Sequence, residues 1–104
     1  MSTVIVYTIH VGLCTNGSPD FVDLNRACLL SILDDRHAVG YTVVEGVGSF
    51  NGETEPTMLV SIYGNPGSTG FDMEEMKVTA KLIKRKLKQE QVWITRSATD
   101  LTII

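Results

Sequence analysis

An aromatic residue and two carboxylates gather in one short stretch of the sequence, GSFNGETEPT, residues 48–57. The Asn-Gly pair within it favours a tight turn between antiparallel strands, because a type I′ turn needs positive φ at both central positions. Phe50 comes directly before this turn, and Glu53 and Glu55 follow it on one face of the next strand. An aromatic ring that faces a carboxylate suits a flat, cationic ligand. The hairpin is therefore a candidate ligand site.

The two glutamates of this hairpin have different alternatives. Glu53, beside the turn, is interpreted as a solvated charge that keeps a sheet edge soluble. Glu55 lies at the start of an apolar strand and faces the same way as Thr57 and Leu59. It is therefore the candidate catalytic residue of the site. A rim glutamate in an ordinary surface ion pair remains the alternative for Glu55, and a core aromatic remains the alternative for Phe50.

Histidine and cysteine residues form no recognisable site in the sequence. His10 and His37 have no cysteine or carboxylate neighbours at metal-ligand spacing, so we expect no metal site. His10 is interpreted as a polar residue on an open sheet face. Cys14 and Cys28 make neither a CxxC pair nor a disulfide framework, and Cys14 is interpreted as a small packing residue. We expect no cofactor.

Length and charge limit the classes of function. With 104 residues and 43% hydrophobic content, the chain fits one domain, residues 1–104. The net charge of −3 argues against an unaided nucleic-acid binder, because phosphate contacts require an excess of Lys and Arg. No apolar run approaches membrane-spanning length, and the N-terminus has no signal-peptide layout. These observations predict a cytoplasmic protein that binds neither nucleic acid nor membrane.

The hydrophobic pattern predicts four strands and a turn. Alternating or apolar runs rich in β-branched residues indicate strands at residues 3–13, 41–50, 57–63 and 91–96. The Asn51-Gly52 turn should join the second and third strands as antiparallel neighbours. Residues 63–70 are expected to form a loop because of their Gly and Pro content, and residues 100–104 a short closing strand.

Two helices are expected between these strands. The first begins with Ser18 as N-cap, continues to about Asp34, and has as its inward residues Phe21, Leu24, Cys28 and Ile32. The second follows Asp72, with an inward stripe of Met73, Met76, Ala80, Ile83 and Leu87. The order βαββαβ is typical of the α+β ferredoxin-like sandwich, in which two helices cover one face of an antiparallel sheet.

The first strand carries apolar side chains on both faces. Ile5, Tyr7 and Ile9 point one way and should pack on the helices, whereas Val4 and Val6 point the other way. An antiparallel sheet with one wet face normally alternates apolar and polar residues. A second apolar face indicates burial by self-association, with a monomer that exposes an apolar face as the alternative.

The hairpin segment GSFNGETEPTMLVSI resembles that of PII-like proteins, trimeric ferredoxin-fold domains whose second and third strands carry a ligand-gating loop. The segment LKQEQVWIT is similar to the Q-E-x-V-hydrophobic start of their last strand. In order of elements the resemblance covers nearly the whole chain. It implies a homotrimer with small-molecule sites between subunits, and it adds Gln89 and Glu90 to the candidate binding residues.

More narrowly, the chain resembles the small phage S-adenosylmethionine lyases, formerly called hydrolases. The segment VYTIHVGLCTN looks like their first strand, and Glu55 falls where they carry an essential glutamate before the third strand. Phe50 stands in place of their tyrosine, so the ring is kept and the hydroxyl is lost. The connection between the hairpin strands is also shorter than theirs.

This resemblance implies a lyase of the phage anti-restriction type, which cleaves S-adenosylmethionine to methylthioadenosine and homoserine lactone. Glu55 would be the catalytic residue, and the substrate contacts would come from Phe50, Glu53, Gln89 and Glu90. A PII-like trimeric sensor that binds an adenine nucleotide and performs no chemistry is the alternative. A purely structural trimer is the third hypothesis.

Overall fold

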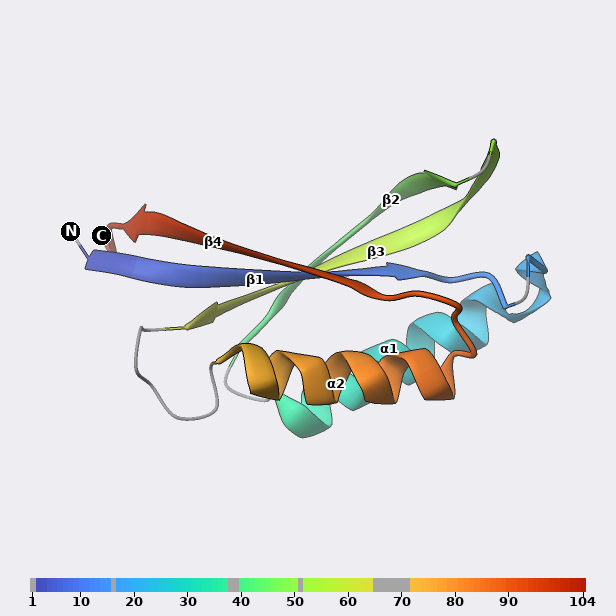
Figure 1. Ribbon diagram of the computed structural model, residues 1–104, viewed down its shortest axis with the longest axis horizontal. Helices are drawn as coiled ribbons and strands as arrows, with labels where there is room; N and C mark the ends of the chain where they lie inside the picture. Colours follow the sequence, from blue (N-terminus) through green and yellow to red (C-terminus); the bar gives the residue numbers. More distant parts are fainter. Residues whose placement is uncertain (1, 16, 38–39, 51, 65–71) are drawn as a thin grey trace.

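The computed structural model describes residues 2–15, 17–37, 40–50, 52–64 and 72–104 (Figure 1). Its elements are, in chain order, β1 (Ser2–Gly12), η1 (Pro19–Phe21), α1 (Val22–Arg36), β2 (Thr42–Phe50), β3 (Glu53–Gly64), α2 (Met73–Lys86) and β4 (Trp93–Leu101). The strands form one antiparallel sheet in the order β2-β3-β1-β4. Both helices lie on the same side of this sheet (Figure 1). The predicted α+β ferredoxin-like sandwich is confirmed.

The core lies between the helices and one face of the two central strands. Alternate residues of β1 point into it, and among them Ile9 is completely buried. The paired residue Val60 of β3 is equally buried. The predicted inward stripe of α2 is confirmed, because Met76 and Ile83 are fully buried and share one apolar cluster with Ile9.

The inward face of α1 differs from the prediction. The chain enters this helix through the 3-10 turn η1, with Ser18 as its N-cap, before the α-helix begins at Val22. A 3-10 turn has about three residues per turn, so it shifts the phase of the helix that follows. Phe21 and Leu24, predicted to point inward, are 48% and 65% exposed. The buried residues of α1 are Asn25, Leu29, Ile32 and Leu33.

The strands β3 and β4 are longer than predicted. β3 begins at Glu53, directly after the turn, rather than at residue 57. β4 continues to Leu101, so the separate closing strand expected at residues 100–104 is wrong, and residues 102–104 have no regular structure. Since β4 is an edge strand paired only with β1, it can be largely polar without losing its place in the sheet.

The predicted hairpin is confirmed by the pairing of β2 with β3. The two strands are antiparallel, and Phe50 lies opposite Glu53 at the tip. Gly52 has a φ of 79°, in the left-handed region that the turn requires. Asn51 and most of the loop predicted at residues 63–70 lie outside the described residues.

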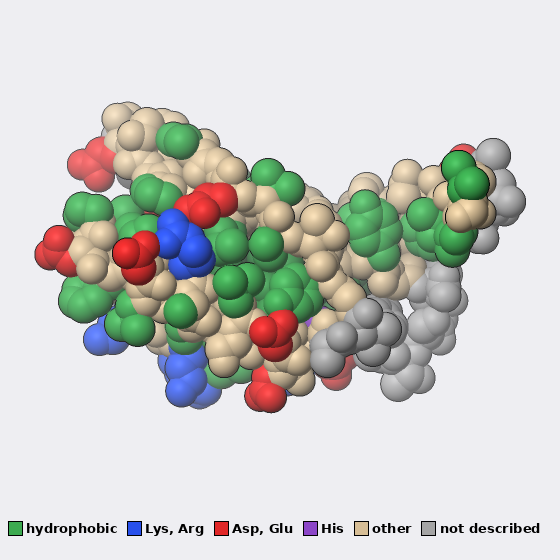
Figure 2. Space-filling view, turned by 180° about the vertical axis from the view of Figure 1, so that it is seen from behind, with side chains coloured by type: hydrophobic (Ala, Val, Ile, Leu, Met, Phe, Trp, Pro, Cys, Tyr) green, Lys and Arg blue, Asp and Glu red, His purple; other side chains and the backbone are tan. Residues whose placement is uncertain are grey.

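The second face of the sheet is not covered by the helices (Figure 1). One row across it consists of Val44, Leu59, His10 and Trp93, each paired with the next. Val44 and Trp93 are both more than half exposed. Figure 2, the view of Figure 1 from behind, to which both the sheet and the helices contribute, shows hydrophobic side chains at the surface between scattered charged ones. In the described part of the chain, no helix is long and apolar enough to cross a membrane.

Candidate functional site

The side chain of Glu55 lies on the sheet face that the helices leave uncovered. In the pairing of β2 with β3, Glu55 is opposite Gly48. The backbone N–H of Cys14, just beyond the end of β1, donates a hydrogen bond to Glu55 Oε2 at 3.2 Å. The glutamate is thereby half-buried and spans from β3 to β1.

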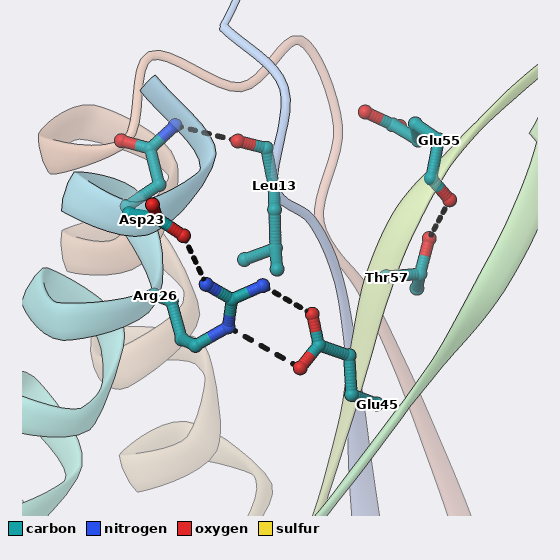
Figure 3. A network of polar contacts seen from close by, with 7 residues as sticks. Leu13, Asp23, Arg26, Glu45, Glu55 and Thr57 are labelled. Atoms are coloured by element: carbon teal, nitrogen blue, oxygen red, sulfur yellow. Dashed lines mark hydrogen bonds and ion pairs between the residues drawn. The ribbon is translucent and has the colours of Figure 1, made fainter. Parts of the chain in front are cut away.

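Two glycines make room for the side chains of this part of β3. A Cβ atom at Gly12 would lie 2.3 Å from Glu55 Oε1, and one at Gly48 would lie 2.5 Å from Thr57 Oγ1. The Thr57 hydroxyl donates to the backbone carbonyl of Glu55 at 3.3 Å (Figure 3). Glu55 therefore leans toward β1 and Thr57 toward β2, each over a strand position that has no side chain.

A proline interrupts the strand beside Glu55, and a side chain of α1 compensates for it. Leu13 N–H donates to the Pro56 carbonyl at 2.9 Å, but Pro56 has no N–H to donate back to the Leu13 carbonyl. Asn25 Nδ2 makes that bond instead, at 2.7 Å. This hydrogen bond explains how a polar residue can occupy the buried face of α1.

Gln89, expected to contact substrate, lies behind the site. Its Nε2 donates to the carbonyl of Cys14 at 2.7 Å and to that of Leu87 at 3.3 Å. These hydrogen bonds connect the turn after α2 to the end of β1. Gln89 holds the residue whose N–H binds Glu55, and its donor group is already used by the backbone.

The other predicted site residues lie at the periphery. Glu53 and Glu90 are exposed, and the carboxylate of neither makes a hydrogen bond or ion pair with another residue that the structure describes. Strand pairing puts Phe50 at the hairpin tip, two residues along the register from Glu55, while the Phe50 side chain lies outside the described part. The structure thus brings Glu55 and Gln89 to the same end of β1, with Cys14 between them.

Cys14 is the contact that sequence reasoning missed as part of the site. Its side chain is 9% exposed, which confirms a packing role. Burial, followed by the negative charge of Glu55 and a hydrogen bond to it, raises the pKa of the Cys14 thiol. The sulfur is therefore a protonated thiol near neutral pH rather than a nucleophilic thiolate. No sequence signal marks the Cys14 N–H as a donor, because every residue except proline has one.

The histidines occupy different surroundings. His10 lies on the uncovered face, as predicted, with its ring centroid 6.4 Å from that of Trp93. His37 is buried and its Nε2 is 2.8 Å from Thr79 Oγ1. Over the described ranges, no three His, Cys, Asp or Glu residues come together as a metal site would require.

Figure 3 also shows Arg26, a basic residue that is already paired with carboxylates. Its guanidinium forms an ion pair with Asp23 at 2.7 Å and donates two hydrogen bonds to Glu45, through Nε and Nη2. The hydrogen bonds to Glu45 and then to Asp23 raise the pKa of Arg26. The Glu55 side chain reaches from β3 toward the segment that carries Leu13, apart from Arg26 (Figure 3). Among the described residues Glu55 has no basic partner. A half-buried carboxylate in this state can bind a cationic ligand.

No protein-family model and no curated protein matches the sequence. Solved structures with the same fold include a phage S-adenosylmethionine lyase in complex with S-methyl-5'-thioadenosine, with a TM-score of 0.64 at 18% identity over 90% of this chain and 80% of that one. The apo state of a phage S-adenosylmethionine lyase gives a TM-score of 0.58 at 17% identity, over 90% and 79%.

CPII, a nitrogen regulatory PII-like protein from Thiomonas intermedia K12 bound to ADP, AMP and bicarbonate, has a TM-score of 0.54 at 10% identity over 98% of both chains. At these identities the likeness establishes the shared ferredoxin-like fold.

Proposed function

We propose that the protein is an S-adenosylmethionine lyase that binds its substrate on the uncovered sheet face and cleaves it to methylthioadenosine and homoserine lactone. The observation that carries this proposal is the Glu55 carboxylate, half-buried beside the end of β1 and without a basic partner among the described residues. The fold shared with phage S-adenosylmethionine lyases supports it.

The proposed reaction needs little from the protein beyond a substrate conformation. The sulfur of S-adenosylmethionine is a sulfonium, so its bond to the γ carbon can break with both electrons going to sulfur. The substrate's own carboxylate attacks that γ carbon and closes a five-membered lactone, while the neutral thioether leaves as methylthioadenosine. If the protein holds the substrate in this folded conformation, the carboxylate and the γ carbon are already close together, and the activation barrier is lower.

Each predicted site residue has a place in this proposal. Glu55 holds the substrate ammonium and so fixes the end of the chain that carries the attacking carboxylate. Phe50 packs near the sulfonium or the adenine. The exposed carboxylates of Glu53 and Glu90 contact the substrate at the edge of the site. Gln89 contributes indirectly, because it holds the backbone of Cys14, which binds Glu55.

The proposal includes assembly into a homotrimer, with each site between two subunits. The apolar residues on the uncovered face support self-association, because more than half of the Val44 and Trp93 surfaces would otherwise remain in water. A phage protein of this kind would act in the host cytoplasm, where removal of S-adenosylmethionine would serve anti-restriction.

The experiment is to incubate the purified protein with S-adenosylmethionine and to measure methylthioadenosine above its formation without protein. Glu55→Gln keeps the size of the side chain and removes its charge. A charge-assisted hydrogen bond is worth about 1.5–3 kcal/mol, so turnover should fall roughly ten- to a hundredfold. Glu74→Gln makes the same change at an exposed carboxylate of α2, on the other side of the sheet, so it is the matched control and should lose little. Equal turnover for wild type and Glu55→Gln would remove Glu55 from the site.

A PII-like sensor that binds an adenine nucleotide without chemistry is the second candidate, since the PII-like neighbour spans 98% of both chains. Calorimetric binding of ADP, AMP or S-adenosylmethionine without methylthioadenosine formation would favour the sensor. Absence of both binding and turnover would favour a purely structural assembly.

A further inference from the structure

Position 12 requires glycine because a side chain there would collide with Glu55. Among the described glycines only Gly17 and Gly52 have positive φ, so the backbone of Gly12 has a conformation that any residue adopts. A Cβ atom there would lie 2.3 Å from Oε1, 2.7 Å from Cδ and 3.0 Å from Oε2 of Glu55. The whole carboxylate group therefore occupies the space that a side chain at position 12 would fill.

The carboxylate is also fixed from the side. The N–H of Cys14 donates to its Oε2 at 3.2 Å, and the carbonyl of the same residue accepts from Gln89 Nε2 at 2.7 Å. Since Gln89 belongs to the turn after α2, the donor that holds Glu55 is itself held by a second element. A shift of the carboxylate away from Gly12 would break the bond to Cys14.

We propose that Gly12 is a positioning residue, which holds the Glu55 carboxylate flat against β1 so that it can bind the primary ammonium of a ligand. This inference rests on the proposed function of Glu55. The role differs from that of Gly48, whose missing side chain accommodates Thr57 and no charged group. A methyl group at position 12 would push the Glu55 carboxylate off the face of β1, away from the place where the ammonium binds.

The backbone amide of Cys14 gives a direct readout of this arrangement. Hydrogen exchange of the ¹⁵N-labelled protein should show this amide protected in wild type and unprotected in Glu55→Ala, which lacks the acceptor. Gly12→Ala should remove the protection as well. Gly46→Ala is the matched control, because Gly46 lies opposite Thr57 on β2 and nothing is within 4 Å of its Cβ position, so the protection should persist.

A stability cycle tests the same contact without any ligand. Gly12→Ala should lower the urea midpoint when Glu55 is present and have little effect in a Glu55→Ala background, where the clash is gone. If Gly12→Ala alone fails to fold, recovery of folding in the double variant supports the proposal. Failure of both variants, with Glu55→Ala alone folded, would overturn it, since another contact would then require the glycine.

Activity completes the test and separates it from the proposed function. Methylthioadenosine formation should fall at least tenfold in Gly12→Ala. If the Cys14 amide of Gly12→Ala exchanges as slowly as in wild type, the positioning role is refuted whatever the activity. If its protection is lost as expected but wild type neither binds nor cleaves S-adenosylmethionine, the positioning of Glu55 stands and the lyase assignment falls.

Discussion

The hydroxyl of Thr79 joins the two helices in the core. Thr79 Oγ1 is 2.8 Å from Arg36 Nε and 2.8 Å from His37 Nε2, and its residue is fully buried. The arginine nitrogen can only donate, so the Thr79 hydroxyl accepts from Arg36, and the direction of its bond with His37 Nε2 depends on the tautomer of the imidazole. Burial, and next the charge of Arg36, lower the pKa of His37 against the opposing effect of Glu75.

Thr79→Val keeps the shape of the side chain and removes this hydroxyl. His37 Nε2, in a residue 6% exposed, is left without a partner, which costs about 1–3 kcal/mol. Arg36 loses one bond but keeps its ion pair with Glu75 at 2.9 Å, so we add only about 0.5–1 kcal/mol for it. The variant should therefore lose about 1.5–4 kcal/mol of the roughly 5–15 kcal/mol that stabilises a domain.

Urea unfolding at pH 8 and a fixed protein concentration measures this loss as a lower midpoint with an unchanged m-value. Thr79→Ser is the control, because it keeps the hydroxyl and removes one methyl group. The loss of that methyl group should lower the free energy of unfolding by about 1 kcal/mol. If Thr79→Val stayed within about 0.5 kcal/mol of wild type while Thr79→Ser was less stable, the hydrogen-bond argument would be refuted.

Three further predictions concern the core, the pH response and assembly. Ile83→Asp should unfold the chain, measured by circular dichroism, because an unpaired buried charge costs several kcal/mol; a folded variant of unchanged stability would contradict the orientation of α2. The lowered pKa of His37 means that the unfolded chain binds the proton more readily, so the stability from this residue is present above about pH 6.5 and is lost as the pH falls through the folded pKa. Urea midpoints of His37→Gln should fall less than those of wild type over that interval. Trp93→Asp should weaken self-association in sedimentation without unfolding the chain, an expectation that fails if wild type is a monomer at micromolar concentration.

The two helices show how far the pattern of the sequence could predict the fold. The buried and exposed sides of α2 differ sharply in polarity, so its inward residues, Met76 and Ile83 among them, were predicted correctly. In α1 the inward face includes Asn25, whereas Leu24 is exposed. Its orientation depends on a hydrogen bond to the end of β1, which hydrophobic periodicity cannot reveal.

The candidate site was predictable in its charged residue but not in its surroundings. Residue type and spacing single out Glu55 within the hairpin. Its contacts to Gly12 and Cys14 are more than forty residues away in sequence and arise only from the pairing of β1 with β3. A backbone donor and a missing side chain have no signature in sequence that distinguishes them from any other amide or glycine.

The bond from Asn25 to Leu13 also limits how the protein can open locally. The pairing of β1 with β3 cannot be completed by the strands themselves at this point, because Pro56 lacks the second donor. The end of the sheet and the first turns of α1 therefore form one cooperative unit, and neither can detach without leaving the Leu13 carbonyl unsatisfied. Since Cys14 follows directly, the donor for Glu55 should be among the last amides of this edge to exchange with solvent.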